Sequence, residues 1–108
     1  NGNVSGFRLN KVSEVPLTYA ISQNYPNPFN PVTSIHYEIP EESFVTISVY
    51  NMMGQKVTDL VHDLRSVGYH QTIWNSNNVE GDPVSSGVYI YTIESGNFRT
   101  MKKMVLMK

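Results

Sequence analysis

Hydrophobic and polar residues alternate along much of the chain. In the clearest example, Val45, Ile47 and Val49 fall on one side of an extended segment, and Thr46 and Ser48 fall on the other. Successive side chains of a β-strand point to opposite faces, so this alternation is typical of a strand with one buried face. We therefore expect Ile47 to lie inside a hydrophobic core.

Further segments show the same alternation or are rich in β-branched and aromatic residues. They predict strands at residues 34–39, 44–51, 56–62, 69–74, 87–94 and 98–107, with a shorter candidate at 17–21. The broken alternation at Leu60 and Val61 predicts a β-bulge or a strand end. No window shows the 3.6-residue period of a helix. Short strands at this spacing predict an all-β fold, an immunoglobulin-like antiparallel β-sandwich of about seven strands.

A proline-rich segment precedes the first clear strand. Pro26, Pro28 and Pro31 each fix the backbone φ angle and remove a hydrogen-bond donor. The segment can therefore form neither a helix nor a central strand. We expect a stiff loop in which Tyr25 and Phe29 are apolar anchors to the core.

The length of 108 residues suits one domain with its own core. We expect residues 1–20 to be a linker or tail from a preceding region and residues 21–108 to form the domain. Within the tail, Phe7, Leu9 and Val12 offer an alternative short edge strand. The net charge of −1 gives no general attraction to nucleic acid or anionic membranes, and the absence of cysteine excludes disulfides.

Candidate catalytic and metal-binding groups are sparse. His36, His62 and His70 lie on different predicted strands, and no serine has the Gly-x-Ser-x-Gly setting of a nucleophile. We therefore expect no enzymatic activity, no metal site and no cofactor. One loop has oxygen-bearing side chains suited to calcium, but only two acids, so a solvated turn is favoured over a calcium site. These side chains belong to Asn75, Asn77, Asn78, Glu80 and Asp82.

Several short motifs, in order along the chain, resemble the C-terminal sorting domain of type IX secretion cargo, in its type A form. They are Gln-Asn-Tyr-Pro-Asn-Pro-Phe-Asn-Pro at 23–31, Thr-Ser-Ile-His-Tyr-Glu-Ile-Pro at 33–40, Val-Tyr-Asn at 49–51, Gly-Gln-Lys-Val at 54–57, Gly-Tyr-His at 68–70 with Trp74, Ser-Gly-Val-Tyr-Ile-Tyr at 86–91, and Lys-Lys-Met-Val-Leu at 102–106. The flagellar hook-cap scaffold protein has a similar immunoglobulin-like module. Met52 and Met53 replace the single aliphatic residue that is usual before Gly54, which we interpret as a difference in packing.

This resemblance implies a non-catalytic secretion signal. The implied partners are the type IX translocon, a sortase and an N-terminal passenger protein. The implied route leads from the periplasm to the cell surface or the extracellular space. The recognition residues that the resemblance implies are Pro26, Asn27, Pro28, Gly87, Tyr89, Tyr91, Lys102 and Lys103.

The last predicted strand combines basic and apolar residues. Arg99, Lys102, Lys103 and Lys108 accompany an apolar run, and no acid lies among them. Lysines on an edge strand block aggregation, but a basic strand with apolar anchors also suits a partner that adds a strand to the edge. The oligomeric state stays open, but the same unpaired edge would allow two copies to form a homodimer through the C-terminal strand.

Two alternative functions follow from the same residues. One is a structural immunoglobulin-like module of an extracellular or flagellar assembly. The other is a carbohydrate-binding accessory domain of a secreted glycosidase, in which Trp74 stacks on sugars. We favour Trp74 as a core residue because it lies in an alternating strand.

Overall fold

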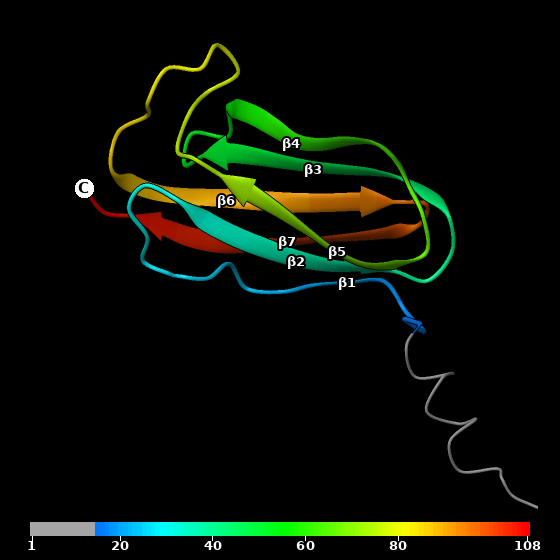
Figure 1. Ribbon diagram of the computed structural model, residues 1–108. Coiled ribbons are helices and arrows are strands. Elements are labelled where there is room, and N and C mark those ends of the chain that lie inside the picture. The colour runs from blue at the N-terminus through cyan, green and yellow to red at the C-terminus, as the bar shows by residue number, and fades with distance from the viewer. Residues whose placement is uncertain (1–14) are drawn as a thin grey trace, which may run out of the picture.

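The computed structural model describes residues 15–108, and these contain strands but no helix (Figure 1). It follows that none of the described residues belongs to a helix that could cross a membrane. The strands are β1 (Ala20–Ile21), β2 (Thr33–Ile39), β3 (Ser43–Asn51), β4 (Lys56–Arg65), β5 (Gly68–Trp74), β6 (Gly87–Ser95) and β7 (Phe98–Leu106).

The strands form two antiparallel sheets that pack face to face. One sheet has the order β1-β2-β5, and the other has the order β4-β3-β6-β7. Strand β6 is central in the larger sheet, between β3 and β7. The predicted immunoglobulin-like β-sandwich is confirmed.

The core lies between the sheets and follows the predicted alternation. Val45, Ile47 and Val49 of β3 are fully buried. From the opposite sheet, β2 contributes Ile35 and Tyr37, which are 0% and 2% exposed. Each large apolar side chain that is fully buried contributes roughly 1.5–3 kcal/mol. The two sheets are therefore held together mainly by side chains that the sequence pattern identifies.

Strand β4 contains the predicted irregularity. Ile47 pairs with Val61, but the next residue of β3, Ser48, pairs with Asp59. Leu60 is therefore the extra residue of a β-bulge, as the broken alternation predicts. Its side chain still packs against the core.

The predicted end of β4 at His62 is wrong, because the strand continues to Arg65. Ser43 opens the partner strand and pairs with Arg65, so the ladder extends further than the apolar residues do. The Arg65 Nε donates to the Tyr37 hydroxyl at 3.2 Å. Residues 63–65 are therefore part of the strand because they pair with β3, and not because they bury apolar side chains.

Two expectations about exposed residues are also wrong. Tyr25 is 80% exposed and is not a core anchor, whereas Phe29 is 3% exposed and is one. Asn24 points inward in place of its neighbour Tyr25. Met52 and Met53 are 63% and 82% exposed, so their presence is not a matter of core packing.

The predicted tail reaches the sandwich before β1. The Tyr19 hydroxyl lies 2.7 Å from the Ser43 hydroxyl, and the Tyr19 ring stacks on Phe98 at 5.5 Å between centroids. The predicted edge strand with Phe7, Leu9 and Val12 lies outside the described residues. The domain boundary between residues 20 and 21 stays a prediction.

The two ends of the sandwich carry different connections (Figure 1). One end has the β3–β4 hairpin turn, the loop at residues 75–86, the proline-rich loop and the end of β7. The other end has the β2–β3, β4–β5 and β6–β7 connections, together with Tyr19. The nine residues of β3 separate the two ends by roughly 30 Å.

Candidate recognition surface at the proline loop and the last strand

The proline loop, residues 22–32, runs alongside the end of β7. The Phe29 amide donates to the Val105 carbonyl at 3.0 Å, and the Met107 amide donates to the Phe29 carbonyl at 2.9 Å. The Val105 amide donates to the Asn27 side-chain oxygen at 2.9 Å. The Asn27 side chain thus provides an acceptor that extends the contact between loop and strand. These contacts cover the edge of β7 near its C-terminal end.

A buried amide side chain holds the loop in shape. Asn24 is 2% exposed, and its Nδ2 donates to the Pro26 carbonyl at 3.1 Å and the Thr33 hydroxyl at 2.9 Å. The Thr33 hydroxyl donates to the same Pro26 carbonyl at 2.9 Å. Gln23 Nε2 donates to the Asn24 side-chain oxygen at 2.6 Å and to the Lys103 carbonyl at 2.8 Å. The side chains of Gln23, Asn24 and Thr33 thus supply hydrogen-bond donors in a segment where the proline backbone has none.

Tyr91 joins this loop to the central strand β6. Its hydroxyl donates to the Ser22 carbonyl at 2.7 Å and accepts from the Asn24 amide at 2.9 Å. The side chain is fully buried. Burial raises the pKa of Tyr91 to about 12, although the hydrogen bond from the Asn24 amide acts in the opposite direction.

Replacing Tyr91 with phenylalanine is expected to remove the part of the free energy of unfolding that is lost at alkaline pH. In the unfolded chain a tyrosine ionises near pH 10, so its raised folded pKa contributes stability that is complete below pH 10 and declines towards about pH 12. At neutral pH we expect Tyr91→Phe to cost about 1–3 kcal/mol, because two hydrogen bonds are lost. Between pH 10 and 12 the wild type should lose about 2 kcal/mol more than the variant, measured by urea unfolding. Parallel pH profiles would contradict this role of the hydroxyl.

The structure brings the predicted recognition residues together around β7. Gly87 pairs with Leu106, Tyr89 with Met104, Tyr91 with Lys102 and Ile90 with Lys103. The proline loop lies against the free edge of the same strand. The whole predicted set, Pro26, Asn27, Pro28, Gly87, Tyr89, Tyr91, Lys102 and Lys103, therefore lies in or beside one region.

These residues differ in what they present to a partner. Pro26, Asn27, Pro28 and Lys103 are exposed. Lys102 and Gly87 are half-buried, and Gly87 has a φ of 154°, which L side chains rarely adopt. Tyr89 and Tyr91 are buried, and the Tyr89 hydroxyl donates to the Ser85 carbonyl at 2.7 Å. The exposed group is therefore accessible to a partner, whereas the two tyrosines lie beneath the surface.

Lys108 lies beside this surface and is tied to the loop at residues 75–86. Its backbone amide donates to the Ser86 hydroxyl at 3.2 Å, and its Nζ donates to the Val84 carbonyl. The basic residue after the last apolar run therefore has a structural contact inside the domain.

Sequence reasoning did not identify Gln23, Asn24 and Thr33 as parts of this region. Their partners lie in Pro26 and in strands that are distant in sequence, so no local pattern reveals them. The available signals are that these residues belong to the motifs at 23–31 and 33–40, and that a segment rich in prolines needs hydrogen-bond donors from side chains.

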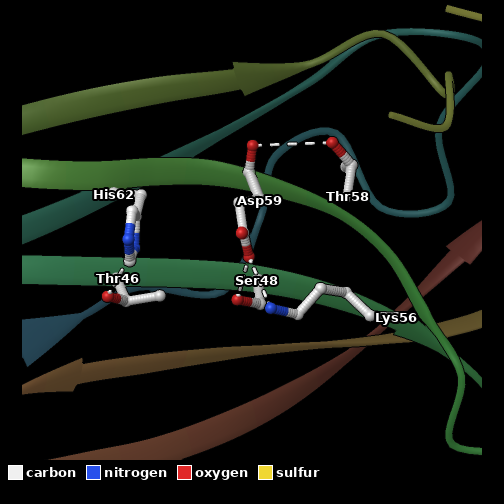
Figure 2. Close-up of polar contacts among 6 residues, drawn as sticks. All are labelled: Thr46, Ser48, Lys56, Thr58, Asp59 and His62. Atoms are coloured by element: carbon white, nitrogen blue, oxygen red, sulfur yellow. Dashed lines mark hydrogen bonds and ion pairs between the residues drawn. The ribbon is translucent and has the colours of Figure 1, made fainter. Parts of the chain in front are cut away.

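A second polar cluster lies on the outer face of the larger sheet (Figure 2). The Ser48 hydroxyl donates to Asp59 Oδ1 at 2.5 Å, and Lys56 Nζ lies 3.2 Å from the same oxygen. Burial raises the pKa of Asp59, but the bonds from Ser48 and Lys56 outweigh this effect, and the pKa falls below its usual value. Ser48 is 2% exposed, so the cluster braces β3 against β4 and does not present a nucleophile.

His62 and His70 lie in different sheets. On the same outer face, His62 Nδ1 lies 3.2 Å from the Thr46 hydroxyl, while the His70 ring stacks on Tyr37 in the other sheet. Among residues 15–108, no three histidine, cysteine or acidic side chains gather to hold a metal ion.

The loop with the oxygen-bearing side chains of residues 75–82 is held by hydrogen bonds within the loop. The Asn78 side-chain oxygen accepts from the Glu80 and Asp82 amides, each at 3.0 Å. The Asn78 amide also donates to the Asp82 carbonyl at 2.8 Å. These bonds match the solvated turn that the shortage of acids favours.

Trp74 is a core residue, as its alternating strand predicts. It is 2% exposed and packs against Phe29 and Tyr89, with ring centroids at 5.8 and 5.2 Å. Its Nε1 donates to the Asn77 carbonyl at 2.9 Å. The alternative hypothesis, a carbohydrate-binding site in which Trp74 stacks on sugars, is therefore wrong.

The smaller sheet also has a shallow groove of about 630 Å³ on its outer face. The outward side chains that line it are Ala20, Ser22, His36, Glu38, Tyr69 and Gln71. None of the predicted recognition residues lines this groove, which meets the proline loop only at Ser22.

The two packed sheets define this chain as an immunoglobulin-like module. A match to a family model identifies the family within this class of fold. Residues 23–107 match the family described as the secretion system C-terminal sorting domain. The chain belongs to this family, as the sequence motifs indicate. These domains are non-catalytic C-terminal signals for type IX export of a cargo protein to the cell surface or the extracellular space.

Solved structures with a similar fold include parts of two proteins from Porphyromonas gingivalis. Dimeric latent PorU aligns with a TM-score of 0.65 and 18% identity, over 82% of this chain and 9% of PorU. PorZ, an essential bacterial surface component of the type-IX secretion system, aligns with a TM-score of 0.56 and 15% identity, over 99% of this chain and 13% of PorZ. No curated protein matches the chain. The chain spans about a tenth of the length of these two structures, and the likeness concerns the fold.

Proposed function

We propose that the surface formed by the proline loop and β7 is the part of the domain that the type IX machinery recognises. The observation that carries this proposal is the direct ladder between the two segments, in which Phe29 and Asn27 bond to Val105. It places the exposed prolines beside the basic strand on one continuous surface. The family assignment makes recognition of this domain the event that directs export.

Within this proposal the exposed and buried residues have different roles. Pro26, Asn27, Pro28 and Lys103 make contact with the reader, whereas Tyr89 and Tyr91 keep the loop and strands in place. Lys102 contributes its charge from a half-buried position at the edge of the sheet.

The proposal also covers the route and the fate of the domain. The domain follows the type A pattern, residues 21–108 form the folded unit, and the cargo passes through the periplasm before it reaches the surface. There a sortase removes the domain from the N-terminal passenger. These statements rest on the motifs. Tyr19, which belongs to the predicted tail, also packs on the sandwich, and this supports a passenger that is joined closely to the domain.

Pairing of two copies through β7 is restricted by the proline loop. The backbone at Val105 and Met107 is already bonded to Phe29, and the Lys103 carbonyl accepts from Gln23. A homodimer through this strand therefore uses residues 98–102 or requires the proline loop to move away.

A charge reversal at Lys103 is expected to reduce export. The whole 108-residue chain is fused to the C-terminus of a periplasmic fluorescent reporter in a bacterium with the type IX machinery. Lys103→Glu should lower the surface signal about tenfold, because a cationic contact becomes a repulsive one. The melting temperature should stay unchanged, since the side chain is exposed.

Arg99→Glu provides the matched control. Arg99 lies on the same face of β7, is exposed and carries the same charge, but it is distant from the proline loop and pairs with Glu94 at 2.9 Å. Export should remain within about twofold of the wild type, because exposed ion pairs contribute little. Equal losses in both variants would indicate a general charge effect and would refute a specific surface. Deleting residues 102–108 is a poorer test, because it removes the buried Met104 and Leu106.

A further inference from the structure

The β3–β4 hairpin turn presents two exposed methionines from a well-ordered turn. The Asn51 side-chain oxygen accepts from the Met53 amide at 2.9 Å and from the Gln55 amide at 3.0 Å. Gly54, with a φ of 84°, donates its amide to the Asn51 carbonyl at 3.0 Å. Asn51 and Gly54 therefore determine the turn, and the Met52 and Met53 side chains are left 63% and 82% exposed.

The turn itself does not require apolar side chains at these positions. Its bonds involve the backbone of Met53 and the side chains of Asn51 and Gln55, so polar residues would fit equally well. Turns usually carry polar residues or glycine and proline. Two adjacent exposed methionines, with no core to pack against, are therefore better explained by contact with another molecule.

The turn lies at the same end of the sandwich as the recognition surface (Figure 1). Asn51 pairs with Tyr89 of β6, and Gly87 at the start of β6 pairs with Leu106 of β7. Val79, which is 79% exposed, lies next to this hairpin, because its amide donates to the Val57 carbonyl at 3.1 Å. An exposed apolar side chain of the neighbouring loop thus lies beside the same hairpin.

The passenger joins the domain at the opposite end. The passenger precedes the domain in sequence. Residues leading into β1 contact the far end, where Tyr19 stacks on Phe98. A folded passenger at that end leaves the β3–β4 turn, with Met52 and Met53, free to contact another protein.

We propose that Met52 and Met53 form an apolar anchor that inserts into an apolar pocket of the protein that recognises the proline loop and β7. The inference rests on the proposed function and extends the recognition surface across the same end of the sandwich to this turn. Methionine suits this role because its flexible, polarisable side chain adapts to irregular pockets. Burial of both side chains adds affinity to a contact that is otherwise polar and basic.

A protein pocket fits this turn better than a lipid surface. Segments that bind membrane surfaces combine a large apolar face with several basic residues and often with tryptophan or phenylalanine. The only cation next to the turn, among the described residues from Asn51 to Asp59, is Lys56, and its ammonium is paired with Asp59 at 3.2 Å. Two methionines without free positive charge provide little affinity for a bilayer.

The test replaces both methionines with glutamine, which keeps the length of the side chain and removes its apolar character. In the reporter fusion with the full chain, Met52→Gln/Met53→Gln should lower the surface signal about tenfold or more. Met52→Leu/Met53→Leu should keep the wild-type signal, because leucine restores the apolar surface. Leu64→Gln is the matched control, since Leu64 is also exposed, at 54%, but lies on β4 near the opposite end of the sandwich, where it pairs with Phe44.

The thermal midpoint of each purified domain distinguishes a lost anchor from lost folding. We expect all of these variants to melt within a few degrees of the wild type, because the altered side chains are exposed. The single variant Met53→Gln, at the more exposed position, should show an intermediate loss of export with an unchanged midpoint.

Different outcomes separate this inference from the function on which it rests. Export of the wild type together with undiminished export of the glutamine variant would overturn the anchor and leave the proposed function intact. A wild-type fusion that folds but stays in the periplasm would refute the proposed function and the anchor with it. Flotation of the domain with phosphatidylethanolamine vesicles, lost in Met52→Gln/Met53→Gln, would replace the protein pocket with a lipid surface.

Discussion

Replacing Ile47 with aspartate is expected to abolish the folded state. Ile47 is fully buried in the middle of β3, where it pairs with Val61 on one side and Ile93 on the other. Loss of the apolar side chain costs about 2–5 kcal/mol, and an unpaired buried carboxylate costs several more. The sum is comparable to the whole stability of a typical domain, about 5–15 kcal/mol. Circular dichroism should show no cooperative thermal transition.

Met101→Asp is the control for this prediction. Met101 is 63% exposed on the outer face of the same sheet, so the same carboxylate should remain hydrated there. Its effect on the free energy of unfolding should stay within about 0.5 kcal/mol. A cooperative transition for Ile47→Asp near the wild-type melting temperature would show that the inward face of β3 is assigned wrongly.

Trp74→Ala is expected to lower the free energy of unfolding by about 3–5 kcal/mol, the usual range for a buried aromatic side chain. The ring fills the space between Phe29 of the proline loop and Tyr89 of β6. Its removal also leaves the Asn77 carbonyl without the indole donor. The urea midpoint should fall while the dependence of the free energy on urea stays the same.

The matched comparison for Trp74 is Tyr25→Ala, an aromatic residue that is 80% exposed. Its loss should cost less than about 1 kcal/mol, because its contact with β2 is made by the backbone. If the two substitutions have similar effects, the contact between the proline loop and Trp74 does not stabilise the domain. A selective loss for Trp74→Ala links the proline loop to the core.

The strands were predictable because their signals are local. Alternation around Ile47 identifies the inward face of β3, and the interrupted pattern at Leu60 identifies the bulge. Trp74 in an alternating strand correctly indicates a core position. The extension of β4 to Arg65 was not predictable from alternation, because Asp63, Leu64 and Arg65 are held by pairing with the start of β3 and bury no apolar side chain.

The candidate site was predictable only as a set of motifs. The sequence places Asn27 and Lys103 far apart, and their proximity arises from the path of the proline loop along β7. The bond between Asn24 and Tyr91 joins residues on different elements, so it leaves no local signature. Exposure of Met52 and Met53 likewise depends on how the turn is oriented, and residue type alone suggests burial.

The parallel contact between the proline loop and β7 has a mechanical consequence. A passenger joined before Tyr19 would pull on the chain at that end, whereas β7 ends at the opposite end of the sandwich. If β7 were held while the passenger moved, the tension would act along the strands. The bonds of Phe29 and Asn27 to Val105 would then be loaded together in shear and would not open one after another. The geometry suits a handle that must keep its shape while its cargo is drawn away.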